Sequence, residues 1–425
     1  MAYANRHRLL PPAAERAPRS RRADRASWEY EAPAGGVRSS TELGGDPIDL
    51  TRTSTPPISE STCLRIGIVA SIAHRTPPRG YGPWEQVAST LAEGLVALGH
   101  DVTLFATADS ITSARLHAEA PHGYEEDPAV DAKVYEGLHI AAAFERAGEF
   151  DVISNQFDFL PLTYSRLVST PVVTTIHGFS SAAILPVYRE YNDVGHYVAI
   201  SDADRHPDLG YEATIHHGIE LSRFTYRPDP GEHLLFLGRI HPDKGTHLAI
   251  EVARQAGLPL VIAGIVQDEA YFRDLVQPHL GRSGVTYAGP VGPAERDALL
   301  GRAVALLHLI GFAEPFGLSV VEALATGTPV IARPLGSMPE IVRHGRTGFL
   351  VDDVAGAVDA VGRIGSLSRQ DCRDDVDARF TADRMVADYA QLFSRIVAGG
   401  PSAANRSRRS GTSMTANRTE ASLAP

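Results

Sequence analysis

Short apolar runs that alternate with helical segments are the feature that most constrains how this chain can fold. From Leu64 onward, runs rich in Val, Ile and Leu are separated by stretches that carry apolar residues at helical spacing. Such alternation is typical of parallel sheets whose strands are joined by crossover helices. The strands expected in the first half are LRIGIVA (64–70), DVTLFA (101–106), DVISN (151–155), VVTTI (172–176), HYVAI (196–200) and ATIHH (213–217).

A second series of runs follows the polar segment TYRPDPGE (225–232), whose prolines and glycine indicate a hinge. At 425 residues the chain exceeds the size at which one hydrophobic core usually keeps growing. We therefore expect two doubly wound α/β domains that face each other across a cleft, with ligands beyond the carboxyl ends of the strands. The strands expected in the second domain are HLLFLGR (233–239), LPLVIAG (258–264), VTYAG (285–289), VALLHLI (304–310) and TPVIAR (328–333).

Composition and apolar periodicity indicate where the terminal segments, the two domains and the last helix begin and end. An arm rich in Arg, Pro and Ser (1–62) and a similar tail (398–425) are predicted to be disordered. Two explanations of the arm remain open: the translation start has been assigned too far upstream, or the arm is a weak electrostatic tether. The expected domains are residues 63–224 and 233–382, on either side of the hinge. A helix is predicted over 383–397, with these apolar residues on one face: Met385, Val386, Tyr389, Leu392, Phe393 and Ile396.

Charge and cysteine content exclude several classes of protein. With 40 basic and 51 acidic residues, the net charge of −11 disfavours nucleic acid or an anionic membrane as the main partner. Cys63 and Cys372 are far apart and are expected to be buried thiols of a cytoplasmic protein, without a zinc or disulfide framework. Apolar runs fall short of the roughly 20 residues that span a bilayer, so no transmembrane segment is expected, while peripheral membrane contact stays open.

A glycine-containing loop follows the first expected strand. In HRTPPRGYGPWEQ (74–86), Gly80 and Gly82 precede a helix expected from Pro83 or Trp84. Glycines let backbone N–H groups approach an anion, and a helix N-terminus adds a favourable partial charge. The pattern matches neither the phosphate loop of nucleotide-binding enzymes nor the dinucleotide fingerprint, and a tight turn explains it equally well.

Two basic residues follow the first strand of the second domain. In LGRIHPDKG, Arg239 and Lys244 lie at the expected carboxyl end of that strand. Arg offers a planar fork and Lys a mobile point charge, so the two could clamp a diphosphate. A solvated basic pair beside Asp243 is the alternative.

The segment GFAEPFGLSVVEALATGTPVIA (311–332) places two carboxylates beside a helix expected from about Phe316. Glu314 is expected in the loop on the cleft side, and Glu322 within the first two helical turns. The spacing Ser319-x-x-Glu322 also fits a capping box, in which the carboxylate serves only a backbone N–H. Paired carboxylates alone would also suit a glycosidase acid and base.

His177 ends the strand VVTTIHG at the edge that faces the expected cleft. A histidine there could donate to a sugar hydroxyl or carry a proton, although a structural role is common for such a residue. The 17 histidines show neither HxH nor HExxH spacing, so no metal site is predicted.

In order and spacing, the motifs GYGPWE, TTIHG, FLGRIHPDKG, EPFGLSVVE and GTPVIARPLGSMPEIVRHGRTGFLV resemble glycosyltransferase family 4 from about Leu64 to Gly400. TLFATADS (103–110) and AISDADR (199–205) resemble the subgroup that includes transferases of oligosaccharide-antibiotic (avilamycin-type) assembly. The family implies the GT-B fold, two Rossmann-like domains. It also implies a nucleotide-diphosphate sugar as co-substrate, no cofactor, no metal, and transfer with retention of anomeric configuration.

The resemblance also implies roles for individual residues. Arg239 and Lys244 would contact the diphosphate, Glu322 the ribose, Glu314 the donor sugar and His177 the transferring sugar. The family's C-terminal helix, here 383–397, crosses back to the first domain. The donor would further be bound by Gly80, Gly82, Gly238, Phe316, Gly317, Leu318 and Ser319. No protein nucleophile is implied.

This chain departs from the family pattern at two positions. No aromatic residue directly precedes Glu314, and His217 stands where many relatives carry Asn. Both departures bear on the choice of donor and acceptor. The acceptor could be a small molecule, a glycan or a lipid-linked sugar. A nucleotide-sugar epimerase, a glycosyl phosphorylase and a non-catalytic nucleotide-sugar-binding protein remain alternatives on the same fold.

Overall fold

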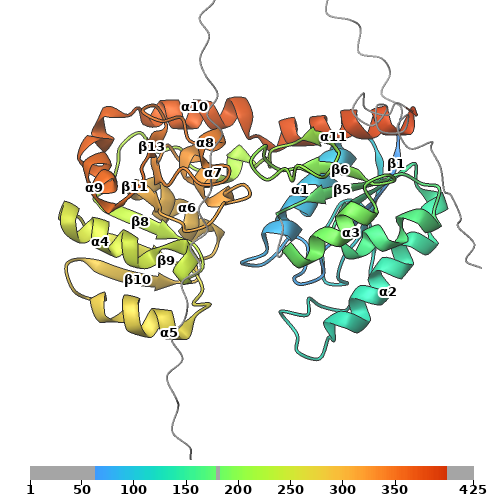
Figure 1. Ribbon diagram of the computed structural model, residues 1–425, viewed down its shortest axis with the longest axis horizontal. Coiled ribbons are helices and arrows are strands. Elements are labelled where there is room, and N and C mark those ends of the chain that lie inside the picture. The colour runs from blue at the N-terminus through green and yellow to red at the C-terminus, as the bar shows by residue number, and fades with distance from the viewer. Residues whose placement is uncertain (1–62, 179–181, 400–425) are drawn as a thin grey trace, which may run out of the picture. The chain divides into compact units, whose positions relative to one another are not determined.

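The computed structural model describes residues 63–178 and 182–399, and two parallel sheets organise this part of the chain (Figure 1). The expected arm and all but the first two residues of the expected tail lie outside the described residues. The first sheet has the strand order β3-β2-β1-β4-β5-β6-β7. Its strands are β1 (Arg65–Ala70), β2 (Asp101–Phe105), β3 (Arg115–His117), β4 (Val152–Gln156), β5 (Val172–Ile176), β6 (His196–Ala199) and β7 (Tyr211–Thr214).

The second sheet repeats this winding with the order β10-β9-β8-β11-β12-β13. Its strands are β8 (His233–Leu237), β9 (Leu260–Ala263), β10 (Val285–Gly289), β11 (Ala303–His308), β12 (Val330–Ala332) and β13 (Gly348–Leu350). In both sheets the first strand of the series lies between the second and the fourth, which makes a topological switch point. Ligands of doubly wound sheets bind at such points, beyond the carboxyl ends of the strands. The predicted fold class is confirmed.

Helices connect the strands of each sheet. The first domain contains α1 (Pro83–Ala97), α2 (Ala132–Glu145), α3 (Leu185–Glu190), η1 (Ala147–Glu149), η2 (Leu160–Leu167), η3 (Ala182–Ile184) and η4 (Leu221–Arg223). The second contains α4 (Thr246–Ala256), α5 (Glu269–Tyr271), α6 (Pro293–Arg302), α7 (Leu318–Ala325), α8 (Met338–Ile341), α9 (Val354–Arg363) and α10 (Arg369–Arg379). It also contains the short turns η5 (Pro242–Lys244), η6 (Phe272–Val276), η7 (Gln277–His279) and η8 (Ile364–Ser366).

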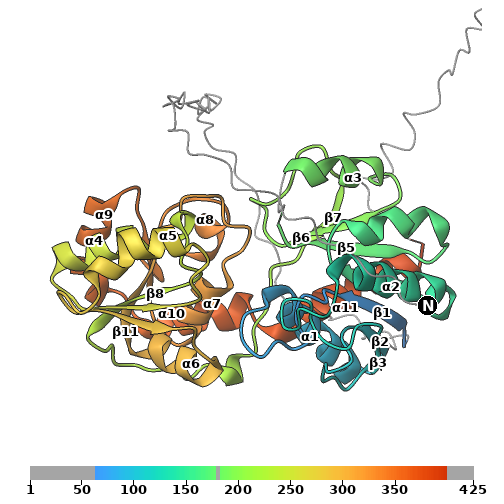
Figure 2. The same ribbon diagram turned by 90° about the horizontal axis from the view of Figure 1, so that it is seen from below.

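The last helix, α11 (Ala382–Val397), packs on the first domain although it follows the second in sequence (Figure 1 and Figure 2). The six apolar residues expected on one face are all buried in the core that β1, β2 and α1 form. The hydroxyl of Tyr389 lies 2.7 Å from that of Thr175 on β5. Burial of an amphipathic face supplies most of the stability of such a helix.

Several expectations about local structure were wrong. Strands β3 and β13 were not predicted, because three-residue edge strands carry too short a pattern. Strand β7 spans Tyr211–Thr214 instead of 213–217, so His216 and His217 lie in the loop beyond it. Cys63 is exposed, because it precedes the first strand, whereas Cys372 is buried.

The expected hinge (225–232) has no regular secondary structure and is hydrogen-bonded to the second domain, where the N–H of Arg227 donates to the carbonyl of Thr326 (3.0 Å).

Candidate active site

The loops that follow β8 and β11 bring Lys244 and Glu314 into contact at the switch point of the second sheet. The ammonium Nζ of Lys244 lies 2.6 Å from Oε2 of Glu314, and both side chains are largely buried. The ammonium also lies 4.6 Å from the centre of the Phe312 ring, a cation–π contact. A cation and a carboxylate that face one another at this edge of the sheet can recognise opposite charges on one ligand.

The backbone fixes the positions of these two side chains. The N–H of Gly311 donates to the carbonyl of Asp243 (2.7 Å), which joins the two loops. The N–H of Ser337 donates to the carbonyl of Glu314 (2.9 Å). Gly336 has a φ of 60°, and a Cβ there would lie 2.4 Å from the backbone nitrogen of Glu314. Only glycine permits this close approach, so the Glu314 loop is held between β11 and α8.

Charge compensation keeps Glu314 ionised. Burial would raise the pKa of Glu314, but the imidazole of His308 and the ammonium of Lys244 outweigh burial and lower it to about 2. His308, at the end of β11, is itself buried, and its Nε2 lies 3.5 Å from the same carboxylate oxygen that Lys244 contacts. At neutral pH the carboxylate is therefore an acceptor that is ready to bind hydroxyl groups.

The glycine loop of the first domain lies opposite Arg239. The phenol of Tyr81, between Gly80 and Gly82, is hydrogen-bonded to the guanidinium of Arg239, which also donates to the side chain of Gln267. Gly82 is the N-cap of α1 with a φ of 154°, and a Cβ there would lie 2.7 Å from Pro78. The loop before α1 and the basic residue at the end of β8 are thus in contact, while their binding of a diphosphate stays a prediction.

Helix α7 begins later than expected. Gly317 adopts a left-handed conformation (φ 92°) as the N-cap, so the helix starts at Leu318 instead of Phe316. Ser319 lies inside the first turn and is not the N-cap, so the capping-box alternative is wrong. Glu322 instead pairs with Arg296 on α6 (3.4 Å). The first N–H groups of a helix have no intrahelical partner, so those of Leu318 and Ser319 can bind an anion.

Glu322 lines a pocket to which α1 also contributes. Its side chain is buried, and Arg296, Leu318, Gln86 and Thr90 line the same pocket. Burial raises the pKa of Glu322, whereas Arg296 and Arg223 lower it. A carboxylate in such surroundings can accept hydrogen bonds from a diol such as a ribose.

His177 lies in a column of stacked rings between Trp84 and His217, with centroid distances of 5.5 and 5.2 Å. Its Nε2 lies 3.0 Å from Oε1 of Gln156 and its Nδ1 lies 3.4 Å from Nε2 of His217. The amide nitrogen of Gln156 donates to Thr175 (2.9 Å), so its oxygen accepts, which assigns the proton to Nε2 of His177. Burial lowers the pKa of His177 to about 3, so the ring is neutral. Its role toward a sugar stays a prediction.

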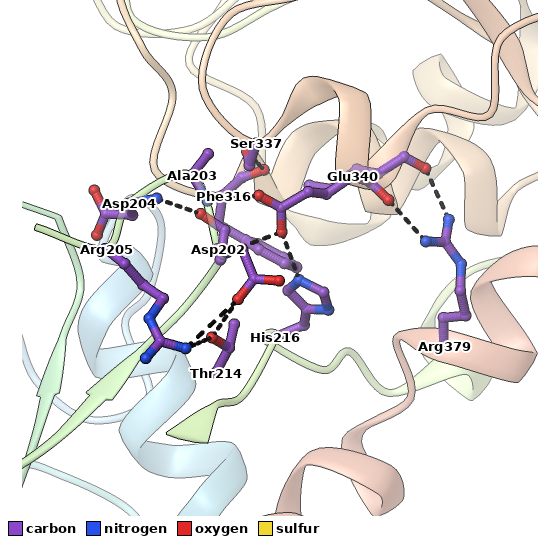
Figure 3. Close-up of polar contacts among 12 residues, drawn as sticks. Asp202, Ala203, Asp204, Arg205, Thr214, His216, Phe316, Ser337, Glu340 and Arg379 are labelled. Atoms are coloured by element: carbon purple, nitrogen blue, oxygen red, sulfur yellow. Dashed lines mark hydrogen bonds and ion pairs between the residues drawn. The ribbon is translucent and has the colours of Figure 1, made fainter. Parts of the chain in front are cut away.

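One carboxylate of the second domain binds the loop that follows β6 in the first (Figure 3). Glu340 on α8 accepts from the N–H of Ala203 (2.7 Å), the N–H of Asp202 (3.0 Å) and Nε2 of His216 (3.0 Å). The His216 ring in turn contacts the ring of Phe316, the residue two after Glu314 (5.9 Å). The loop that carries Glu314 is thus connected to the contact between the domains.

Sequence reasoning missed His308, Arg296 and Tyr81 as members of this site. Tyr81 stands between two glycines that were singled out, so its position was a usable signal. The other two had none, because each acquires its partner from another element of the fold.

Neither a metal-binding cluster nor a membrane-spanning helix is present among the described residues. Within 63–178 and 182–399, no group of three or more His, Cys, Asp or Glu side chains is arranged to hold a metal ion. In the same ranges, no helix has both the length and the apolar character required to cross a bilayer.

Two family models match successive parts of the chain. The model described as Glycosyltransferase Family 4 matches residues 84–223, and the model described as Glycosyl transferases group 1 matches residues 220–375. The two matched ranges overlap at residues 220–223, just before the expected hinge. The matched residues include His177 in the first model and Lys244, Glu314 and Glu322 in the second.

A curated relative and two solved structures extend these matches. A D-inositol 3-phosphate glycosyltransferase of Rhodococcus erythropolis is 34% identical over 208 residues, or 40% of this chain and 46% of the relative. The chain thus spans about half the length of the curated relatives that it matches first. AviGT4, a glycosyltransferase involved in avilamycin A biosynthesis, is 25% identical with a TM-score of 0.62, covering 79% of this chain and 98% of AviGT4. The fold is shared with HepE of Anabaena, solved with UDP and glucose (17% identity, TM-score 0.61, 78% and 99% coverage).

The expected likeness to the avilamycin-type subgroup is therefore confirmed. On the two family models and the paired parallel sheets, the chain belongs to the glycosyltransferases of family 4 and group 1, with the GT-B fold.

Proposed function

We propose that the protein is a retaining, metal-independent glycosyltransferase that moves a sugar from a nucleotide-diphosphate sugar to an acceptor hydroxyl. The observation that carries the proposal is the contact between Lys244 and Glu314 at the switch point of the second sheet. A cation suits the diphosphate and a carboxylate suits the hydroxyls of the adjoining sugar. The HepE structures, solved with UDP and with UDP-glucose, support this class of donor.

Cleavage of a glycosyl–phosphate bond places negative charge on the leaving diphosphate. Lys244, Arg239 and the N–H groups of Leu318 and Ser319 are the groups that would stabilise this charge. A preorganised donor of this kind is worth about 3 kcal/mol in the transition state. Because cationic side chains supply this stabilisation, the proposal requires no metal ion.

The remaining residues would bind and orient the donor. Glu314 would accept from the donor sugar, Glu322 from the ribose, and the Gly80–Gly82 loop would complete the diphosphate site. His177 would lie beside the transferring sugar. Donor binding between the domains would exclude water and limit hydrolysis. The two separated cysteines support a cytoplasmic location.

A thermal-shift screen tests the donor. The purified protein is heated with UDP, GDP, ADP and TDP and their common sugars, with and without EDTA. A ligand at a hundredfold excess over Kd stabilises the native state by about 2.7 kcal/mol. We expect a shift with one nucleotide that EDTA does not abolish, and a shift that EDTA abolishes would contradict metal independence.

A product assay then separates the rival activities. The protein is incubated with the donor identified in the thermal screen and a panel of sugar and lipid-linked acceptors. NMR of the product should show the same anomeric configuration as that of the donor. Inversion would refute retention. Conversion of the donor without an acceptor would indicate an epimerase, use of inorganic phosphate as the acceptor a phosphorylase, and binding without turnover a non-catalytic protein.

A further inference from the structure

Trp84 is a half-buried aromatic residue that the proposed function does not use. It is the second residue of α1, and its contact with His177, which directly follows β5, places it at the carboxyl edge of the first sheet. Its indole stacks on the ring of His177, with 5.5 Å between the centroids and 23° between the ring planes. Within residues 63–178 and 182–399, no other ring contacts the indole, and its N–H makes no hydrogen bond. Trp84 therefore has ring surface and a donor group to offer a ligand.

Hydrogen bonds fix the ring on which Trp84 stacks. Gln156, at the end of β4, is fully buried, and its amide nitrogen donates to Thr175 (2.9 Å). Its oxygen accepts from Nε2 of His177 (3.0 Å), and the ring of His217 stacks on His177 at a centroid distance of 5.2 Å. His177 is thus held by its neighbours before any ligand binds. A preorganised aromatic surface loses little conformational entropy when it binds a ligand.

The rings of Trp84, His177 and His217 continue into the second domain. The ring of His217 packs against the ring of Phe316 at a centroid distance of 5.0 Å, and Phe316 is the second residue after Glu314. His217 and Phe316 are 4% and 3% exposed, so Trp84 is the end of this column that a ligand can reach. Three ring contacts separate Trp84 from the loop that would bind the donor sugar.

We propose that Trp84 is the surface on which the acceptor stacks, and that this acceptor is a carbohydrate ring. The inference rests on the proposed function, because transfer requires an acceptor beside the donor. One face of a sugar ring carries mainly C–H groups, which pack against an aromatic face, and the free indole N–H can donate to a hydroxyl at the edge of the sugar. Small-molecule sites combine such aromatic surface with a few polar groups.

The position of Trp84 favours the acceptor over the donor sugar as its ligand. Trp84 belongs to the first domain, whereas Glu314, the proposed ligand of the donor sugar, belongs to the second. Because three ring contacts lie between them, a sugar ring stacked on Trp84 is a different ring from the one that Glu314 would bind. The two substrates would then be held by different domains at the same edge of the first sheet.

Tryptophan fluorescence tests the inference. The chain has two tryptophans, so Trp28→Phe leaves Trp84 as the only emitter. Sugars are titrated into this variant with the nucleotide from the thermal screen present at saturation, so that any effect of the nucleotide on Trp84 is already complete. The probes are N-acetylglucosamine and the methyl glycosides of glucose, galactose and mannose.

At least one of these sugars should shift the emission of Trp84 to shorter wavelength in a saturable way, because a stacked sugar displaces water from the indole. Mannitol and glycerol offer hydroxyls without a ring and should cause no such shift. An equal shift with mannitol, or no shift with any of the ring sugars, would overturn the inference. This measurement leaves Trp84 itself unchanged, so it does not depend on the folding of a Trp84 variant.

Two substitutions separate a binding surface from a packing residue. Trp84→Leu keeps an apolar side chain without an aromatic face, and Trp84→Phe keeps an aromatic face without the N–H. With the acceptor found in the product assay, Trp84→Leu should raise the acceptor KM about tenfold or more and leave the donor KM unchanged, whereas Trp84→Phe should raise it only a few-fold. Leu167→Ala, at an exposed apolar residue of η2, is the control and should change neither constant. Equal increases of both KM values in Trp84→Leu would overturn the inference.

The outcomes distinguish this inference from the proposed function. A product that forms only with an acceptor lacking a carbohydrate ring would overturn the inference and leave glycosyl transfer intact. If UDP-glucose, GDP-mannose, ADP-glucose and TDP-glucose all fail to bind, the proposed function fails and this inference with it.

Discussion

The guanidinium of Arg296 lies 3.4 Å from the carboxylate of Glu322, and this ion pair joins α6 to α7. Among the described residues, the buried Nε of Arg296 has no hydrogen-bond partner. Glu322 is 9% exposed, so the pair is formed at the wall of a pocket and not on the open surface. Arg296 thus orients a carboxylate that still has acceptor capacity for a ligand.

Removal of the Glu322 charge should weaken donor binding more than it slows the chemical step. Hydrogen bonds to a charged group contribute about 1.5–3 kcal/mol, so Glu322→Gln should raise the donor KM roughly tenfold to hundredfold. Turnover at saturation should fall only a few-fold, because the ribose lies away from the reacting bond. Steady-state kinetics with the donor found in the thermal screen measures both constants. Glu269→Gln, an exposed carboxylate of α5, serves as the control, and an unchanged KM in Glu322→Gln would remove the residue from the donor site.

Loss of either partner of the Lys244–Glu314 pair should slow turnover strongly. Lys244→Ala removes a cation beside the leaving diphosphate and Glu314→Ala removes an acceptor for the donor sugar, so each should lower kcat by about a hundredfold or more. Because the two side chains touch, the double variant should be less impaired than the product of the two single effects. Melting temperatures serve as the control for folding. Unchanged turnover in either single variant would exclude that residue from the proposed chemistry.

The fold was predictable from local patterns, and the exceptions have physical reasons. Strands buried on both faces appear as continuous apolar runs, which is why β1 and β11 were recognised from the sequence. The edge strands β3 and β13 have three residues each, too few for a pattern. Helix α7 starts at Leu318 because Gly317 has a left-handed conformation and cannot be part of the helix. The apolar periodicity of the helix does not show this conformation.

The candidate site was predictable only where its residues follow strands. Lys244 and Glu314 were candidates because each lies just beyond an expected strand. Their contact could not be predicted, because it depends on β8 and β11 being neighbours in the sheet. His308 could not be recognised from the sequence, because its partner Glu314 lies in the loop beyond the strand and the contact forms only in the folded chain. Arg296 lies on a helix whose sequence carries no motif, and its partner depends on the packing of α6 against α7.

The carboxyl group of Asp204 should make stability depend on pH. Burial raises the pKa of Asp204 to about 7, and the negative charge of Glu340 adds to the effect. Its Oδ2 has no hydrogen-bond partner in the described ranges. An acid whose folded pKa lies above its unfolded value of about 4 binds more protons when folded, so stability falls as pH rises between about 4 and 7.

Asp204→Asn should therefore stabilise the protein at pH values above 7 and make little difference below about pH 4. The expected gain is on the order of 2 kcal/mol in the free energy of unfolding. Urea denaturation of both proteins across this pH range measures the difference. The exposed neighbour Asp208, changed to Asn, is the control. A gain that is equal at all pH values would show that the charge of Asp204 is not its cause.

Glu340 should hold the two domains together, because one carboxylate binds three donors of the other domain (Figure 3). Glu340→Ala leaves the N–H groups of Asp202 and Ala203 without their acceptor and should lower the free energy of unfolding by about 1–3 kcal/mol. It should also increase the radius of gyration of the donor-free protein in X-ray scattering, since the domains lose this contact. Asp359→Asn breaks an exposed ion pair with Arg363 and should cost less than about 0.5 kcal/mol without a change in dimensions. If Glu340→Ala alters neither stability nor scattering, other contacts hold the domains. One such contact is the ring of His217, which packs against the ring of Phe316 in the second domain and against the ring of His177 in the first.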